Sequence, residues 1–198
     1  NLGFTHCCIE DIGVLRSIPN ISIVVPSDPF ELFKVLNEAV NYENSVYIRL
    51  TAGSNTKVIN SKDYKFKIGK AEQILPGDDV AIIGCGNILG NCLEAASVLQ
   101  DKKIQCSVVN MHTIKPIDKE KIKDIARKKK LIVTVEEHNI FGGLGSSVAE
   151  VLAGERNNCK LVRVGINDFY SSGGSYEYLK NIYGLSVEKI IETVLKNL

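Results

Sequence analysis

Short apolar runs alternate with longer amphipathic segments along this chain, and that order restricts the folds available to it. "ISIVVP" at residues 21–26 is a nearly continuous apolar run, and "SVYIRLT" at 45–51 follows a helix-like segment. Continuous runs rich in β-branched residues are typical of strands buried on both faces of a parallel sheet. A strand–helix–strand order favours parallel pairing with a right-handed crossover. We therefore predict an α/β fold.

Helix signals separate these strands. The segment 9–18 carries apolar residues at helical spacing, and Pro19 ends it. In "SDPFELFKVLNEAV" Asp28 is expected to cap a helix, Pro29 suits its first position, and Glu31 completes a capping-box pattern.

A change in composition separates two units. Residues 52–75 are small, polar and lysine-rich, and we interpret them as a linker plus a hairpin or edge strand. Beyond them strands alternate with helices again, which predicts an open, doubly wound, mostly parallel sheet. The expected boundaries are a first unit at 1–58, a linker at 59–75 and a second unit at 76–198. We expect strands at 78–84, 104–111, 131–138 and 160–166, and helices at 87–103, 118–130, 145–154 and 186–198, with Asp118 and Ser186 as caps.

The charge balance argues against several classes of partner. Lys and Arg number 24 against 23 Asp and Glu, a net charge of +1, which leaves no global field to attract nucleic acid or an anionic membrane. The basic run 127–130 is expected to complement the C-terminal end of the preceding helix. No apolar run approaches the roughly 20 residues of a membrane span.

The six cysteines, at positions 7, 8, 85, 92, 106 and 159, form no CxxC pair and have no His at ligand spacing. We therefore expect no metal site and no disulfide framework, but reduced thiols buried as small hydrophobes. No signal peptide precedes the fold. These features predict a cytoplasmic protein.

The turn Gly84-Cys85-Gly86 lies where a dinucleotide-binding loop would lie. Leu89 stands in place of the third glycine, however, and Asn110 stands where an acid would bind a ribose hydroxyl. The hypothesis of a nucleotide-dependent oxidoreductase is supported by this turn alone. We interpret it as a tight strand-to-helix turn that needs no side chain.

A polar cluster closes the predicted strand 131–138. Glu136, Glu137 and His138 lie at its carboxyl end, the edge at which α/β sheets bind ligands. Gly142 and Gly143 then introduce a helix, whose N-terminus favours anions. Two interpretations stay open for the cluster: a catalytic pair of carboxylates, or a capping or interface network.

The chain opens with a histidine in a glycine loop. Gly3 allows close approach of the backbone to a ligand, and Thr5 and His6 offer a hydroxyl and an imidazole that donate or accept near neutral pH. These residue types suit a catalytic or substrate-binding loop as well as a structural one.

Motifs along essentially the whole chain resemble those of the thiamine-diphosphate-dependent transketolase family. "GFTHCCIEDIGVLRSIPNISIVVPSDPFE" is similar to the pattern G-x-T-H-x-x-I-E-D, R-x-I-P-N, P-x-D of the family's pyrimidine-binding domain. "VVNMHTIKPID", "VTVEEHNIFGGLGSSVAEVL" and "YGLSVEKI" look like its C-terminal domain. The resemblance implies a partial pyrimidine-binding α/β domain followed by a doubly wound transketolase C-terminal domain.

The resemblance also implies a cofactor and a partner. In the family, thiamine diphosphate and Mg are held by an N-terminal domain, and a glutamate upstream of the T-H motif protonates the aminopyrimidine. Because the sequence contains neither region, we expect a missing half on the same chain or on a separate subunit, in a homodimer or heterotetramer. The chain by itself is expected to bind no cofactor and to be inactive.

Site residues follow from the same resemblance. His6 resembles the histidine that lines the substrate channel beside the thiazolium and moves protons on sugar hydroxyls, while Gly3 and Thr5 shape that loop. Glu10 is expected to hold the loop and a subunit contact. Arg49 is predicted to bind substrate.

Two departures from the family pattern concern the substrate. Leu2 stands where relatives usually carry an acid that binds a substrate hydroxyl, and Ala52 lies where an arginine usually grips a phosphate. Arg49 could replace that arginine only with a shift of strand register. We therefore expect a small sugar that is not a simple phosphoketose, or a phosphate bound through the missing partner.

The leading prediction is a C-terminal section or subunit of a transketolase, which transfers a two-carbon ketol unit between sugars. Alternatives are deoxyxylulose-phosphate synthase and the beta subunit of 2-oxoacid dehydrogenases. "IEDIGVLRSIPN" matches transketolase better, because the synthase is expected to lack an acid near Glu10 and the beta subunit to have V-P-G at residues 18–20. An alternative of another class is a catalytically incomplete dimerisation or scaffold fragment.

Overall fold

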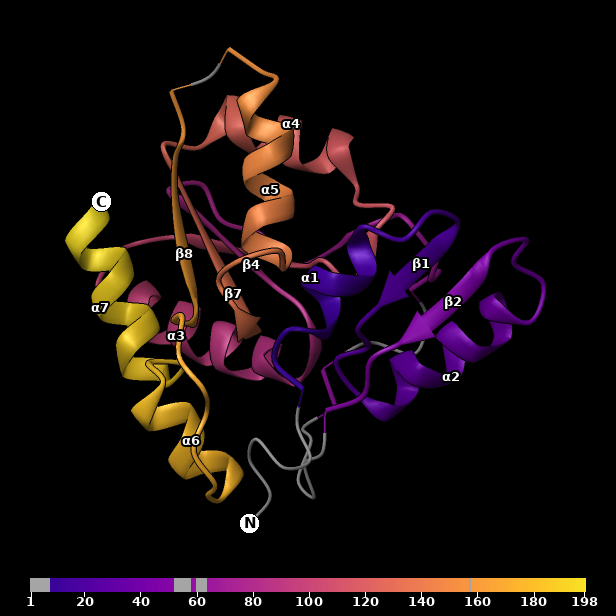
Figure 1. The fold of residues 1–198 in the computed structure, drawn as a ribbon. Coiled ribbons are helices and arrows are strands. Elements are labelled where there is room, and N and C mark those ends of the chain that lie inside the picture. The colour runs from indigo at the N-terminus through magenta and orange to yellow at the C-terminus, as the bar shows by residue number, and fades with distance from the viewer. Residues whose placement is uncertain (1–7, 52–57, 60–63, 157) are drawn as a thin grey trace.

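The structure is a computed structural model that describes residues 8–51, 58–59, 64–156 and 158–198. Two sheets flanked by helices lie side by side (Figure 1). The strands are β1 (Ile21–Val24), β2 (Ser45–Ile48), β3 (Glu72–Leu75), β4 (Val80–Gly84), β5 (Cys106–Asn110), β6 (Thr113–Lys115), β7 (Leu131–Asn139) and β8 (Lys160–Ile166). The helices are α1 (Asp11–Arg16), α2 (Pro29–Ala39), α3 (Leu89–Asp101), α4 (Lys119–Lys128), α5 (Leu144–Ala153), α6 (Tyr176–Ile182) and α7 (Val187–Asn197), with a 3-10 turn at Gly86–Ile88 before α3.

The larger sheet has five strands in the order β3-β5-β4-β7-β8. β4 pairs in parallel with β5 and β7, and β7 pairs in parallel with β8. β3 runs antiparallel to β5 as an edge strand, one of the two outcomes expected within residues 52–75. The predicted doubly wound, mostly parallel sheet is thereby confirmed.

Alternating side chains of β4 fill a core on each face of this sheet. Val80 and Ile82 are fully buried in a cluster with residues of α3 and α7, while Ala81 and Ile83 are buried with residues of α4 and α5. The pairs of helices accordingly cover opposite faces (Figure 1). A strand that is apolar at every position is what two covered faces require.

The smaller sheet has the order β2-β1-β6. β1 and β2 are parallel, as predicted, and pair from Ile21 with Ser45 to Val24 with Ile48. β6 comes from the second half of the chain, directly after β5, and pairs antiparallel with β1. Sequence patterns did not predict β6, because three residues are too few to show a periodicity.

The predicted helix caps are confirmed. Asp28 Oδ1 accepts from the Glu31 N–H at 2.8 Å, Asp118 Oδ1 from the Lys121 N–H at 3.1 Å, and Ser186 Oγ from the Lys189 N–H at 3.3 Å. Glu31 Oε2 accepts from the N–H of Ser27, one residue before the cap, at 2.7 Å. The helix α6 was not predicted; its seven residues bury no side chain fully.

The glycine turn after β4 is confirmed as a tight turn. Gly86 has a φ of +70°, and a Cβ there would lie 3.0 Å from Val25 Cγ1, so a side chain would be strained and crowded. Among the described cysteines Cys85, Cys92 and Cys106 are buried, as predicted, whereas Cys8 is exposed and Cys159 half-buried. None of the described helices has both the length and the apolar character that crossing a membrane demands.

Asp28 supplies the first test. It is only 4% exposed, and its Oδ2 also accepts from the Ile59 N–H at 2.8 Å. Asp28→Ala leaves two buried donors without their acceptor, so we expect the free energy of unfolding in urea to fall by about 2 to 3 kcal/mol. Ser186→Ala, at a more exposed cap, is the control and should cost about 0.5 to 1 kcal/mol. Equal losses in the two variants would contradict this assignment.

Candidate functional site

The predicted substrate loop lies outside the described residues. Gly3, Thr5 and His6 fall in that part of the chain, as do Leu2 and Ala52. The described chain begins at Cys8, two residues after the predicted catalytic histidine. Their roles therefore stay predictions, and the site is built from the residues that adjoin the loop.

Five polar side chains from four elements meet beside Cys8, and we call them the junction cluster. Asp11 begins α1, Arg49 directly follows β2, Glu137 and His138 lie at the carboxyl end of β7, and Tyr176 begins α6. The cluster forms where the first unit of the chain packs on the second (Figure 1).

Arg49 is the centre of the junction cluster. Its Nε donates to both carboxylate oxygens of Asp11, at 3.1 and 2.9 Å, and its side chain is only 11% exposed. Its Nη2 donates to the backbone carbonyls of Cys8, at 3.0 Å, and Glu137, at 2.9 Å. Burial disfavours the charged guanidinium, but the charges of Asp11 and Glu137 outweigh it and raise the pKa of Arg49. The Asp11 carboxylate also accepts from Tyr47 Oη at 2.9 Å.

Glu137 connects the cluster to the C-terminal region. Its carboxylate accepts from the hydroxyl of Tyr176 and, at 3.3 Å, from Thr51 Oγ1. Burial raises the pKa of Glu137, and the hydrogen bond from Tyr176 opposes that rise. Burial and the adjacent carboxylate also raise the pKa of Tyr176, which keeps its phenol neutral and able to donate.

His138 joins β7 to α1. Its Nδ1 lies 2.7 Å from the carbonyl oxygen of Asn139, and its Nε2 accepts from the Gly13 N–H at 3.2 Å. A carbonyl only accepts, so the proton of the neutral ring is on Nδ1. Burial lowers the pKa of His138. A Cβ on Gly13 would lie 3.3 Å from the carbonyl oxygen of Phe141, so a glycine allows this close packing.

Glu136 caps a helix. Its two carboxylate oxygens accept from the N–H groups of Leu144, at 2.6 Å, and Gly145, at 2.8 Å, in the first turn of α5. Burial raises its pKa to about 7, against the effect of these two donors. Glu136, Glu137 and His138 thus have three separate sets of hydrogen-bond partners, although His138 Nδ1 also lies 3.9 Å from Glu136 Oε2. These contacts correspond to the capping and interface interpretation of the sequence.

The chemistry of the junction cluster follows from these pairings. Among the described residues, no group of three or more His, Cys, Asp or Glu side chains is arranged to hold a metal ion. The carboxylates of Asp11 and Glu137 face hydrogen-bond donors, and Arg49 holds two backbone carbonyls. The cluster can therefore fix chain segments in place and neutralise buried charge.

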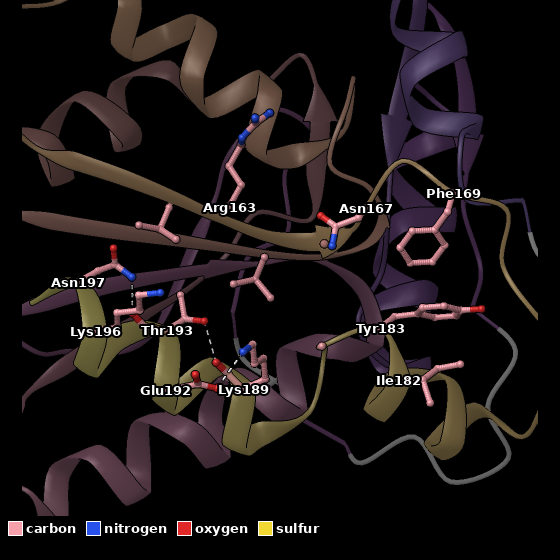
Figure 2. A pocket seen from close by; sticks show the side chains of 14 residues that line it. Arg163, Asn167, Phe169, Ile182, Tyr183, Lys189, Glu192, Thr193, Lys196 and Asn197 are labelled. Carbon is pink, nitrogen blue, oxygen red and sulfur yellow. Dashed lines mark hydrogen bonds and ion pairs between the residues drawn. The ribbon is translucent and has the colours of Figure 1, made fainter.

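A groove of about 460 Å³ lies elsewhere, between the free edge of β8 and α7 (Figure 2). Lys189 and Glu192, one turn apart on α7, form an ion pair at 2.8 Å along one wall of the groove. The guanidinium of Arg163 points away from α7 (Figure 2) and donates to the Ile140 carbonyl at 2.9 Å. The groove shares no residue with the junction cluster. The junction cluster is the stronger candidate for function, because it contacts Cys8, two residues after the predicted catalytic histidine.

Sequence reasoning missed four residues of the junction cluster and its direct partners, namely Asp11, Tyr47, Thr51 and Tyr176. Asp11 is part of the quoted I-E-D motif and received no role of its own. Thr51 and Tyr176 carry no local signal, because their partner Glu137 lies 86 and 39 residues away along the chain. Of these residues only Asp11 could have been noticed in the sequence itself, because an acid in the first turn of a helix is a favourable position.

Comparisons with known proteins agree with this fold. Residues 2–57 match the family profile described as transketolase, pyrimidine binding domain, and residues 69–190 match transketolase, C-terminal domain. A Methanocaldococcus jannaschii protein named transketolase C-terminal section is 37% identical over 99% of this chain and 61% of its own length. The 1-deoxy-D-xylulose-5-phosphate synthase of Heliobacterium modesticaldum is 38% identical over 95% of this chain and 29% of its own length.

A solved structure gives the same result in three dimensions. It is a split-gene transketolase in the form of an inactive beta4 tetramer, with a TM-score of 0.92 and 38% identity over 99% of this chain and 64% of that chain. The present chain thus spans about three fifths of the length of the curated relative from M. jannaschii.

Glu136 makes the stability of the protein depend on pH. Its pKa is about 7 in the folded chain against an ordinary 4.5, so folding takes up a proton between these values. The stabilisation is complete below pH 4.5 and declines as the pH rises toward 7, by up to about 3 kcal/mol. We expect the free energy of unfolding in urea to fall more steeply over this range in the wild type than in Glu136→Gln, which does not titrate. Parallel curves would contradict the raised pKa.

Proposed function

This chain belongs to the transketolase family, and on that premise we propose that it is the C-terminal section or a separate subunit of an enzyme that transfers a two-carbon ketol unit between sugars. One observation carries the proposal: both transketolase profiles match this chain in order, on a backbone similar to that of a split-gene transketolase. The alternative of a scaffold fragment explains neither the T-H motif of the sequence nor the buried junction cluster beside Cys8.

The cofactor of the complete enzyme is thiamine diphosphate, with Mg as its metal. Because the family holds its cofactor in an N-terminal domain that the matched residues 2–57 and 69–190 do not include, we assign the cofactor and metal to a diphosphate-binding half on the same chain or on a partner subunit. When bound, the cofactor supplies the electron sink for cleavage of a carbon–carbon bond. This chain contributes His6, which exchanges protons with sugar hydroxyls, and Gly3 and Thr5, which shape the loop around it.

The proposed partners follow from the same assignment. The active assembly contains this chain and the diphosphate-binding half, as a homodimer or a heterotetramer. Its substrates are small sugars, and we place it in the cytoplasm because the five described cysteines are thiols outside any disulfide.

A second candidate is deoxyxylulose-phosphate synthase. The identity to the H. modesticaldum synthase is as high as that to the transketolase section. The I-E-D and I-P-N motifs favour ketol transfer. Chromatography of the reaction products distinguishes the two, because accumulation of 1-deoxy-D-xylulose 5-phosphate by the assembled enzyme would replace our first assignment with the second.

His6 supplies the direct test of the activity. In the complete enzyme, loaded with thiamine diphosphate and Mg, His6→Ala should lower kcat/KM for ketol transfer by about 10² to 10⁴, because it removes a proton-transfer group. His6→Gln keeps a hydrogen-bonding side chain without a titratable proton and should be equally impaired. Cofactor affinity, measured by calorimetry, should stay unchanged in both. Full activity in His6→Gln would contradict the role in proton transfer.

Ala52 tests the nature of the substrate. At the position of Ala52, relatives usually carry an arginine that binds the phosphate of the sugar. Ala52→Arg should therefore raise kcat/KM for xylulose 5-phosphate about tenfold or more, since a charge-assisted hydrogen bond contributes about 1.5 to 3 kcal/mol. Ala52→Gln adds similar bulk without charge and should give no gain. Steady-state kinetics that find xylulose 5-phosphate already the best donor of the wild type would overturn the expectation of an unusual sugar.

A further inference from the structure

We propose that Arg49 is a positioning residue that clamps the chain at Cys8, two residues after His6, to the end of β7, with Tyr176 and Glu137 supporting the clamp, rather than a ligand of the substrate. This inference rests on the proposed function, because it concerns the loop that carries His6. It replaces the substrate contact that the family resemblance suggests for Arg49.

The geometry of the guanidinium supports this role. One nitrogen, Nη2, donates both to the carbonyl of Cys8 and to the carbonyl of Glu137. Cys8 follows His6 by two residues, and the bonds from Nη2 tie its carbonyl to the end of β7. A second nitrogen, Nε, donates to the carboxylate of Asp11. A sugar phosphate could bind Nε and Nη2 only by displacing these acceptors of the protein itself.

The first turn of α1 is held by the same contact. Asp11 is the first residue of α1 and directly follows the loop and Glu10. Its carboxylate accepts from Arg49 and Tyr47, and its side chain is only 10% exposed. Arginine suits this position because its planar fork reaches several acceptors at fixed angles, whereas a lysine ammonium is a point charge on a flexible stem.

Tyr176 brings the C-terminal region into the clamp. Its hydroxyl and that of Thr51 both donate to the carboxylate of Glu137, whose backbone carbonyl accepts from Arg49. Lys180, one turn along α6, lies 4.7 Å above the Tyr176 ring. Glu137, whose carbonyl accepts from Arg49, is therefore held by Thr51 from the first unit of the chain and by Tyr176 from the second.

Loss of the clamp should change turnover rather than affinity for phosphate. A displacement of about 1 Å in catalytic geometry can lower a rate by about 10²-fold. In the complete enzyme we expect Arg49→Lys to lower kcat about 10- to 100-fold, by the same factor for a phosphorylated and an unphosphorylated ketol donor, with KM changed less than about threefold. Tyr176→Phe should show the same pattern with a smaller loss.

Steady-state kinetics with both donors distinguish a positioning role of Arg49 from direct binding of the substrate phosphate by Arg49. Arg163→Lys is the matched control, because Arg163 also donates to a backbone carbonyl but lies outside the junction cluster, and it should keep wild-type kinetics. If Arg49→Lys does not fold, Asp11→Asn removes the anionic partner of Arg49 and keeps its charge, and it should lower kcat for both donors. A raised KM for the phosphorylated donor alone, in either variant, would overturn the clamp and make Arg49 a phosphate ligand. A wild-type enzyme without ketol transfer would instead refute the proposed function.

Discussion

The pairing of β6 with β1 is the contact on which the arrangement of the two units depends. β6 is only three residues long and follows β5 of the larger sheet, yet it pairs with β1 through Ile23 with Lys115 and Val24 with Thr113. The apolar side chains agree with this connection, since Ile12 and Ile23 of the first unit are buried in the same cluster as α4 and α5. The two sheets therefore share a core, and the ends of β2 and β7 come together in a fixed relation.

Charged groups meet at that shared boundary, and their pairing explains how the structure tolerates them. Removing a carboxylate or a guanidinium from water is costly unless partners compensate for the lost hydration. Arg49 lies between Asp11 and Glu137, and each of its described bonds ends on a carboxylate or a carbonyl. The protein thus keeps a polar support at Cys8, two residues after the histidine that is proposed to move protons. Such support is how folded proteins hold a catalytic group within a narrow range of positions.

Local signals predicted the elements well, and they failed for contacts between distant parts of the chain. Asp28, Asp118 and Ser186 were identified as caps because each bonds an N–H only three residues away. The helix α6 buries no side chain fully, so it lacks the apolar stripe by which helices are found in a sequence. The strand pattern predicted that Glu137 lies at the carboxyl edge of the sheet. Its partners Thr51 and Tyr176 could not be predicted, because they lie 86 and 39 residues away in the sequence.

The α/β alternation, the helix caps, the tight turn at Gly86 and the resemblance to transketolases could all be predicted from the sequence, because each shows in residues a few positions apart. The folded chain was needed to find that Glu136 caps a helix while Glu137 and His138 join the two units, and that Arg49 faces Asp11 and two carbonyls. A side chain takes its partners from the register of its strand and from the packing of neighbouring elements, and neither is written in any short stretch of sequence.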